Sequence, residues 1–240
     1  IQHQAVGRTL IKIQTEVVPT GKMDDIVAML KEAVSVGVGT EDAPRDVGAP
    51  EEVKARDTWR RQLETIKTPT GIPPLDERLG GGLGPGELGV IMAGPSRGKT
   101  TGLIQFAINA VMHGRKNVFY VSREQDFFKL GTKLDSCLLG MTRAELMMKP
   151  KSTRKRWEEL YADTKARIKL KKYKKPCNAD EILADIRQME TRDSFKTELL
   201  IIDYADKMKP LVQRKVDSNY DIQGDIYQDI FDLCAELNIP

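Results

Sequence analysis

The sequence is poor in the residues that build metal clusters and disulfide frameworks. Its 240 residues include only three cysteines and two histidines. The cysteines, Cys137, Cys177 and Cys234, lie far apart along the chain, and no spacing typical of a metal site is present. We therefore expect three buried, free thiols in a protein from a reducing compartment.

Long apolar runs and a strong excess of one charge are also missing. No run approaches the roughly 18 apolar residues that cross a bilayer, and no signal peptide opens the chain, so we expect a cytoplasmic protein without membrane contact. The net charge is only 38 − 35 = +3, which does not by itself indicate a nucleic-acid-binding protein. The chain starts at Ile1 and stops at Pro240, directly after a helical pattern. We therefore expect a fragment, or a chain with missing ends.

The first 67 residues are predicted to be helical and loosely connected. Apolar residues at helical spacing between positions 23 and 34 predict an amphipathic helix, and residues 37–50 are rich in glycine, proline and acids, as linkers are. Residues 1–50 are thus expected to form a small helical N-terminal region with a linker. A charged helix is predicted over 51–67. Its narrow apolar stripe packs either on its own domain or on a neighbouring subunit.

From residue 68 onward, strand patterns alternate with helix patterns. A turn with five glycines in residues 80–86 precedes the first predicted strand. This alternation predicts an α/β fold with a mainly parallel sheet flanked by helices, which would occupy residues 68–240. Strands are predicted at 88–92, 118–121, 168–170 and 199–203, and helices at 99–113, 127–139, 152–167, 182–189 and 226–237.

A phosphate-binding loop is predicted between the 88–92 strand and the helix that follows it. Residues 93–100 fit the pattern [A/G]-x-x-x-x-G-K-[S/T] in the required strand-loop-helix context. Backbone N–H groups of such a loop and of the helix N-terminus form an anion-binding nest. Lys99 would bind the β- and γ-phosphates of ATP, and the Thr100 hydroxyl would bind Mg²⁺. The predicted binding residues are Ala93, Gly94, Pro95, Ser96, Arg97, Gly98, Lys99, Thr100 and Thr101.

Two acidic residues follow later strands of the predicted sheet. Asp203 ends the apolar run 199–202, at the edge where ligands bind in open parallel sheets, and we expect it to orient a water on Mg²⁺. Capping or a salt bridge is the structural alternative. Glu124 follows the 118–121 strand and could polarise the water that attacks the γ-phosphate, although composition alone favours a surface acid.

These motifs together resemble the RecA-like core of DnaB-type replicative helicases, and bacteriophage-encoded versions are the most similar. The resemblance covers roughly residues 68–240 and is patchy over 140–195. The T-G-x-x-x-L-D opening is shared with the RadA and KaiC branches, whereas the loop, Ser-x-Glu and Ile-Asp-Tyr favour the helicases. The residues on which the resemblance rests are Thr70-Gly71-Ile72-Pro73-Pro74-Leu75-Asp76, Pro95-Ser96-Arg97-Gly98-Lys99-Thr100, Ser122-Arg123-Glu124 and Ile202-Asp203-Tyr204.

The resemblance implies a role for each matching position. Lys99 and Thr100 would bind the triphosphate and Mg²⁺, Glu124 would be the catalytic base, and Asp203 would assist the metal. Residues 207–223 fall where such helicases present a DNA-facing loop, which would place four cations on DNA phosphates; a solvated loop is the alternative. They are Lys207, Lys209, Arg214 and Lys215.

The resemblance also implies partners, and the sequence departs from the family in places. Single-stranded DNA, a hexameric ring of identical subunits, and replisome or loader proteins would be the partners. The 51–67 helix lies where the family has a linker helix that docks on the neighbouring subunit. Asp206 stands where these helicases usually have glutamine, so no role is carried over to it. The usual helical N-terminal domain is not recognised in residues 1–50.

A second basic concentration spans residues 151–175 and interleaves with aromatic residues. It is either an electrostatic track for nucleic acid or a solvated helix face and a lysine-protected edge strand, and the second interpretation is preferred. For the chain as a whole, an ATP-driven replicative helicase is the favoured hypothesis. The alternatives are a recombinase-like filament on single-stranded DNA and a KaiC-like regulatory ATPase.

Overall fold

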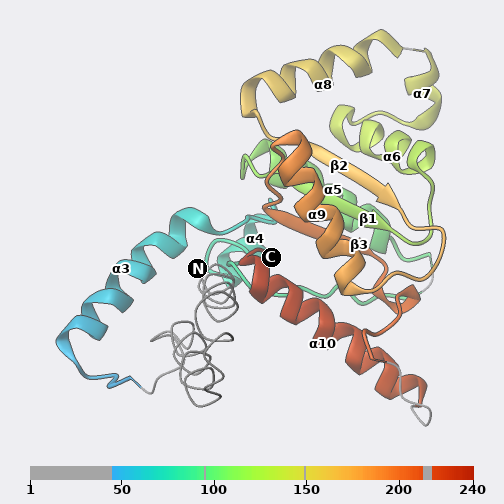
Figure 1. Ribbon diagram of the computed structural model, residues 1–240. Coiled ribbons are helices and arrows are strands. Elements are labelled where there is room, and N and C mark those ends of the chain that lie inside the picture. Colours follow the sequence, from blue (N-terminus) through green and yellow to red (C-terminus); the bar gives the residue numbers. More distant parts are fainter. Residues whose placement is uncertain (1–44, 95, 149, 213–217) are drawn as a thin grey trace, which may run out of the picture. The chain divides into compact units, whose positions relative to one another are not determined.

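The computed structural model describes residues 45–94, 96–148, 150–212 and 218–240, with the side chains of 63–65 and 150 excepted (Figure 1). The chain divides into two compact units, Ile1–Trp59 and Arg60–Pro240. The helix predicted near positions 23–34, and most of the predicted linker 37–50, lie outside the described residues. Helix α3 (Pro50–Ile66) corresponds to the charged helix predicted over 51–67.

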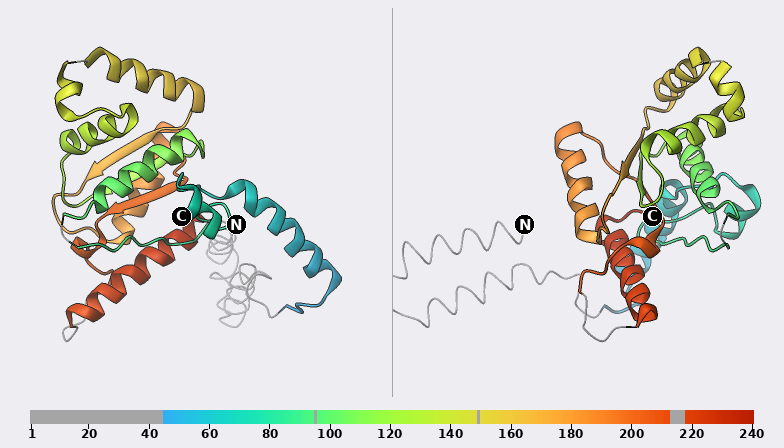
Figure 2. Two further views of the ribbon diagram at one scale, coloured as in Figure 1. Left: turned by 180° about the vertical axis from the view of Figure 1, so that it is seen from behind. Right: turned by 90° about the vertical axis from the view of Figure 1, so that its right-hand side faces the viewer.

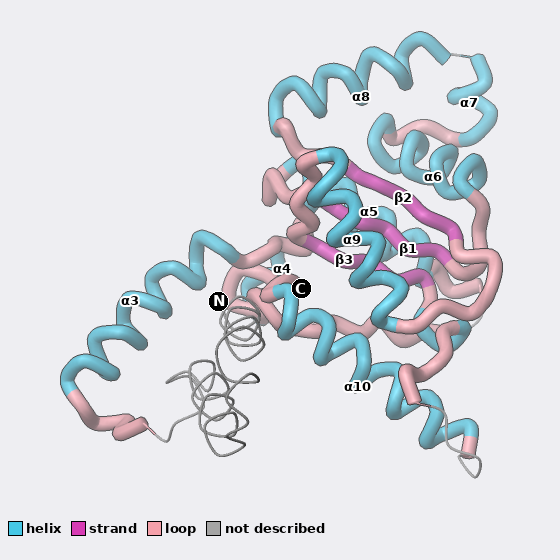
Figure 3. Tube along the Cα trace, viewed as in Figure 1, coloured by secondary structure: helices cyan, strands magenta, loops and turns pink. Residues whose placement is uncertain are grey.

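A three-stranded parallel sheet forms the centre of the larger unit. Its order is β2 (Ile168–Lys172), β1 (Val118–Ser122), β3 (Leu199–Asp203). Strand β1 pairs with both neighbours, so that Ser122 lies opposite Asp203 on one side and opposite Lys172 on the other. The three carboxyl ends therefore meet at one edge of the sheet, which is where an open parallel sheet binds its ligands. Figure 3 shows these strands in magenta, with loops leaving that edge.

Helices cover both faces of the sheet, as buried parallel sheets require. Strand β1 alternates: Val118 and Tyr120 join one core cluster, whereas Phe119 and Val121 join the other. The first cluster includes residues of α5 (Lys99–Met112), α6 (Phe127–Leu139) and α8 (Pro150–Thr164). The second includes residues of α9 (Ala179–Asp193) and α10 (Asn219–Leu237). The right-hand view of Figure 2 shows α5 and α9 on opposite sides of the sheet.

The T-G-x-x-x-L-D motif locks the entry to this fold. The Asp76 carboxylate accepts hydrogen bonds from the Thr70 N–H and hydroxyl (both 2.7 Å) and from the Gly71 N–H (2.9 Å), which fixes the turn before α4 (Pro73–Arg78). Asn109 of α5 donates to the Thr70 carbonyl at 2.8 Å. The motif is thus an architectural clamp that ties the segment before the phosphate loop to the helix after it.

The glycine-rich turn closes back onto the same segment. Thr68 and Leu83 form an antiparallel bridge with N–H···O distances of 2.8 and 2.9 Å. Gly82 has a φ of 121°, and a Cβ there would lie 2.2 Å from the Thr68 carbonyl oxygen. Only glycine therefore fits this position.

The strand predicted over 88–92 is not formed. These residues are assigned no strand, and an apolar groove of about 350 Å³ lies between the segment and β3. The edge of β3 that faces away from β1 has no paired strand in the described chain. Its one backbone hydrogen bond there runs from the Leu200 N–H to the Pro240 carbonyl. Val90, Ile91 and Met92 are exposed. The apolar run predicted a buried strand, but a strand also needs a neighbour that accepts and donates its hydrogen bonds. Here the groove separates the segment from β3, the strand it would pair with.

The helix boundaries differ from the prediction mainly where a cap was overlooked. Helix α10 begins at Asn219, earlier than predicted, because Ser218 and Asp221 form a capping box. The last part of the segment predicted as a loop over 207–223 is therefore helical. Helix α9 likewise begins at Ala179 through the Asn178–Glu181 capping box. Short helices α4 and α7 (Arg143–Met148) and the 3-10 turn η3 (Ala205–Lys207) were not predicted.

All three cysteines are free, and two of them are buried. Cys177 and Cys234 are buried and free as predicted, whereas Cys137 is free but only partly buried, with its Sγ 3.1 Å from Gln105 Oε1. In the part of the chain that the structure describes, no helix combines the length and apolarity needed to cross a membrane.

Candidate nucleotide-binding site

The predicted phosphate loop leads from an extended segment into the N-terminus of α5. The Arg97 N–H donates to the Gly94 carbonyl at 3.3 Å, and Gly98 is the N-cap residue of α5 with a φ of 87°. A Cβ at Gly98 would project into open space, so the backbone conformation, rather than crowding by protein atoms, demands glycine here. Within the predicted set, Pro95 lies outside the described residues and Thr101 is exposed on α5.

Lys99 and Thr100 form the first turn of α5, where helical N–H groups have no intrahelical acceptor. The Lys99 ammonium donates to the Ala93 carbonyl at 2.7 Å, so it lies across the loop. The Thr100 hydroxyl points to the sheet and donates to Asp203 Oδ1 at 3.2 Å. The helix terminus, an ammonium group and a hydroxyl thus converge on one small region, which is suited to an anion and its counter-cation.

Asp203 is a buried carboxylate at the end of β3. Only 1% of the residue is exposed, and burial raises the pKa of its carboxyl group, while hydrogen bonds from Thr100 and Tyr120 act to lower that pKa. Within the described residues no lysine or arginine forms an ion pair with it. A carboxylate in this setting is stabilised by a nearby cation.

Tyr120 is a site residue that the sequence analysis missed. Its hydroxyl donates to Asp203 Oδ2 at 3.1 Å, so the two oxygens of Asp203 are held by Tyr120 and Thr100 respectively. Tyr120 is fully buried, and burial together with the Asp203 charge raises its pKa well above the usual range, which keeps it a neutral donor. The register explains the contact, because Tyr120 lies opposite Ile201 and is a diagonal neighbour of Asp203 on one sheet face.

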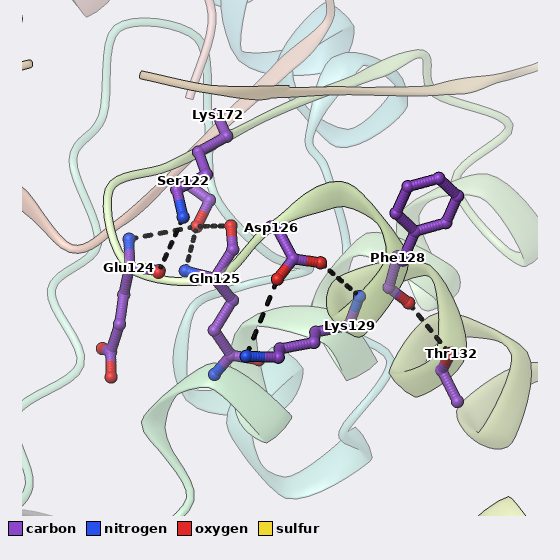
Figure 4. A network of polar contacts seen from close by, with 8 residues as sticks. All are labelled: Ser122, Glu124, Gln125, Asp126, Phe128, Lys129, Thr132 and Lys172. Atoms are coloured by element: carbon purple, nitrogen blue, oxygen red, sulfur yellow. Dashed lines mark hydrogen bonds and ion pairs between the residues drawn. The ribbon is translucent and has the colours of Figure 1, made fainter. Parts of the chain in front are cut away.

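Glu124 lies on a short turn directly after β1 and is exposed. The turn is shaped by the buried Ser122, whose Oγ accepts from the N–H groups of Glu124 (3.3 Å) and Gln125 (3.0 Å) and donates to the Gln125 carbonyl. Figure 4 shows the Glu124 carboxylate directed away from this cluster. Its charge is a lesser cause of the raised Asp203 pKa, after burial, which places the two acids within electrostatic reach.

The residues fit a magnesium–nucleotide complex. Hydroxyl and carboxylate oxygens, such as those of Thr100 and Asp203, are the ligands that Mg²⁺ takes in phosphate sites, with the phosphates and waters completing its shell. The described residues contain no cluster of three or more histidine, cysteine, aspartate or glutamate side chains that could hold a metal alone. The open space beside Gly98 is the cradle that a phosphate would need.

The four predicted DNA-contacting cations do not share one environment. Lys207 lies in η3 with its ammonium 4.8 Å from the centre of the Tyr204 ring. The Lys209 ammonium nitrogen lies 3.6 Å from Glu181 Oε2 of α9, and the backbone N–H of Lys209 donates to the Cys177 carbonyl. Arg214 and Lys215 lie outside the described residues. Asp206, at the position of the family's glutamine, accepts a hydrogen bond from Tyr227 of α10 at 3.0 Å.

Acidic partners offset much of the second basic concentration, residues 151–175. On α8, Arg154 pairs with Glu158, and both Lys155 and Arg156 pair with Glu159. On β2, the ammonium groups of two lysines contact α9 or its end. They are Lys169, which contacts Asp193, and Lys171, which contacts Asp185. These pairs are expected of an ion-paired helix face and of an edge strand protected by lysines.

Comparisons with known proteins point to one family. Residues 68–240 match the family described as DnaB-like helicase C terminal domain. The fold is similar to that of a DnaB-like replicative helicase studied with its interactions with primase (TM-score 0.59, 19% identity, 98% of this chain and 55% of that one). It is also similar to the solved ATPase domain of a phage protein (TM-score 0.60, 21% identity, 81% of this chain and 69% of that one).

The structural matches and the family match support different conclusions. The chain spans about half the length of the first of these structures (55%), and at such identities both structural matches show the fold alone, which is that of RecA-like helicase ATPase domains. A comparison with curated proteins gives no match. The family match, in contrast, covers well over half of the chain. The chain therefore belongs to the DnaB-like helicase C-terminal domain family, and residues 68–240 correspond to that domain.

Proposed function

We propose that this protein is an ATP-dependent motor on single-stranded DNA, a replicative helicase that unwinds duplex DNA by ring translocation. One observation carries the proposal within the family. Thr100, in the first turn of the phosphate-loop helix, shares a hydrogen bond with the buried Asp203 at the carboxyl edge of the sheet. A phosphate-binding helix terminus and a metal-binding acid are thereby joined in one site, as nucleotide hydrolysis requires.

Each residue at this edge has a proposed role in the reaction. Backbone N–H groups of the loop and Lys99 bind and neutralise the triphosphate, and Thr100 with Asp203 holds Mg²⁺ through oxygen atoms. When bound, the metal neutralises the charge that develops on the transferred phosphoryl group. Glu124 orients the attacking water and accepts its proton. The exposed position of Glu124 supports this role, since a base must reach a water outside the protein core.

The oligomer and its partners are part of the same proposal. We propose a hexameric ring in which α3, between an N-terminal region (1–50) and the ATPase core (68–240), docks on the adjacent subunit. Trp59 and Ile66 of α3 support this arrangement, because they are 57% and 38% exposed in the single chain, and exposed large apolar residues mark interaction surfaces. One similar structure is described with primase, and we propose replisome or loader partners of that kind.

The decisive experiment is ATP hydrolysis by the intact protein, with and without single-stranded DNA, at increasing salt. We expect DNA to stimulate hydrolysis, and this stimulation to fade with salt, since phosphate contacts release counterions. A strand-displacement assay then tests unwinding, and electron microscopy with ATP and oligonucleotide distinguishes closed rings from filaments. Hydrolysis that is indifferent to DNA at every salt concentration would refute the motor and leave a regulatory ATPase.

A further inference from the structure

Arg123 connects the three segments that leave the carboxyl edge of the sheet. Its backbone N–H donates to the Asp203 carbonyl at 2.8 Å. Its guanidinium donates through Nε to the Lys207 carbonyl at 3.2 Å and through Nη1 to the Tyr173 carbonyl. A single side chain thus spans the loops that follow β1, β2 and β3. Two carbonyl acceptors at different directions suit the planar, multi-donor guanidinium and not a point charge.

Two of the three segments that Arg123 connects carry the proposed base and the proposed DNA contact. Glu124 is its sequence neighbour on the turn that Ser122 shapes (Figure 4), and Lys207 begins the segment proposed to face DNA. Displacement of the main chain at Lys207 would therefore be felt at Glu124.

Burial differs between the start of the turn and Glu124. Ser122 is fully buried in the sheet and anchors the start of the turn, whereas Glu124 is exposed and its side chain is free of the turn's hydrogen bonds. The Glu124 carbonyl also accepts a hydrogen bond from Lys172 Nζ at 3.3 Å. We therefore expect a displacement of the Arg123 side chain to move the exposed Glu124 more than the buried strand. Packed strands move less readily than short exposed turns.

We propose that Arg123 is a positioning residue that couples the DNA-facing segment to the catalytic base, through its hydrogen bond to the Lys207 carbonyl. DNA bound near Lys207 sets the position of Glu124 through this bond and so raises the rate of hydrolysis. The inference rests on the proposed function, and it adds the physical link by which the motor senses its track. A residue of this kind changes the coupling between two sites more than it changes either site alone.

The test compares Arg123→Ala, Arg123→Gln and Arg123→Lys with the parental protein. Steady-state ATP hydrolysis is measured with and without single-stranded DNA, and DNA affinity is measured separately by fluorescence anisotropy. We expect Arg123→Ala to lower the stimulation factor at least about fivefold, the lower range of allosteric coupling, with DNA affinity and the KM for ATP near parental values. Lysine, which keeps the charge, and glutamine, which keeps one donor group, should give intermediate factors.

Matched controls and the opposing outcomes make the test decisive. Arg187→Ala removes an exposed guanidinium that pairs with Glu236 and should leave the stimulation factor unchanged, and thermal melts confirm that all variants fold. Parental stimulation in Arg123→Ala overturns the inference, and so does a proportional loss of basal and stimulated rates, which indicates a merely structural clamp. A parental protein that DNA does not stimulate overturns the proposed function itself, and that result needs no variant.

Discussion

Two acidic residues lie at the ends of adjacent strands of the same sheet, Asp203 within β3 and Glu124 just after β1, and their surroundings are opposite in kind. Asp203 is 1% exposed, with both carboxylate oxygens held by hydroxyl donors. Glu124 is exposed, and in the described residues its hydrogen bonds run through its backbone groups, to Ser122 Oγ and from Lys172 Nζ. A fixed carboxylate suits a metal site, whose geometry must be the same in every cycle, whereas an acid on an adjustable turn can be moved into and out of its working position.

This difference suggests how one edge of a sheet can hold a metal-bound nucleotide and also regulate its hydrolysis. The strand end supplies rigidity, because Asp203 is part of β3 and packs between β1 and α5. The turn that begins one residue beyond β1 is proposed to allow the position of Glu124 to be adjusted. Only its start is fixed to the strand, by the hydrogen bonds of Ser122. The following predictions test whether the two acids divide the work in this way.

The largest effect is expected from a change at Lys99, the proposed phosphate-binding lysine. Lys99→Ala deletes the ammonium that would neutralise the β- and γ-phosphates, so nucleotide-dependent activity should fall to background. Binding of a fluorescent ATP analogue and hydrolysis are both measured, with Lys129→Ala on α6 as a control that retains both. Normal turnover in Lys99→Ala would show that residues 93–101 are not the nucleotide site.

A smaller and more selective effect is expected at Glu124. Glu124→Gln keeps the shape and the turn but removes the proton acceptor, so nucleotide should still bind while hydrolysis slows by about 100- to 10,000-fold. Glu158→Gln, in the exposed pair with Arg154 on α8, is the matched control. If Glu124→Gln hydrolyses ATP at the parental rate, the base is another group and the contrast with Asp203 loses its meaning.

Much of this site could be predicted because its information is local. The spacing of Gly98, Lys99 and Thr100 defines a loop and a helix start, and the four apolar residues before Asp203 define a strand that ends in an acid. The prediction gave the bounds of α6 and β3 as the structure has them. Patterns of this kind need no knowledge of what lies across the sheet.

The remainder depends on partners distant in sequence. Residues 88–92 have an apolar pattern typical of a strand, but pairing requires a neighbour, and a groove separates them from β3. Similarly, Arg123 is an ordinary surface cation until the Lys207 and Tyr173 carbonyls are placed beside it. Tyr120 is the clearest example. It lies in a strand predicted over 118–121, and only the β1–β3 register brings its hydroxyl to Asp203.

The smallest effect follows from that missed contact and tests how rigidly Asp203 is held. Tyr120→Phe removes the donor to Asp203 Oδ2 while keeping the buried ring, so the carboxylate loses one of its two orienting bonds. The Mg²⁺ concentration for half-maximal nucleotide binding should rise by about tenfold or slightly more, because a hydrogen bond to a charged group contributes at least about 1.5 kcal/mol. Fluorescent ATP-analogue binding titrated with Mg²⁺ measures it without relying on turnover.

The matched control for Tyr120→Phe is Tyr161→Phe on α8. Its hydroxyl only accepts a long, 3.5 Å hydrogen bond from the Ile168 N–H, so the Mg²⁺ requirement should not change. An unchanged Mg²⁺ requirement in Tyr120→Phe would mean that Thr100 and the surrounding packing alone orient Asp203. The rigidity assigned to this acid would then come from burial, and the contrast with Glu124 would be one of exposure rather than of hydrogen bonding.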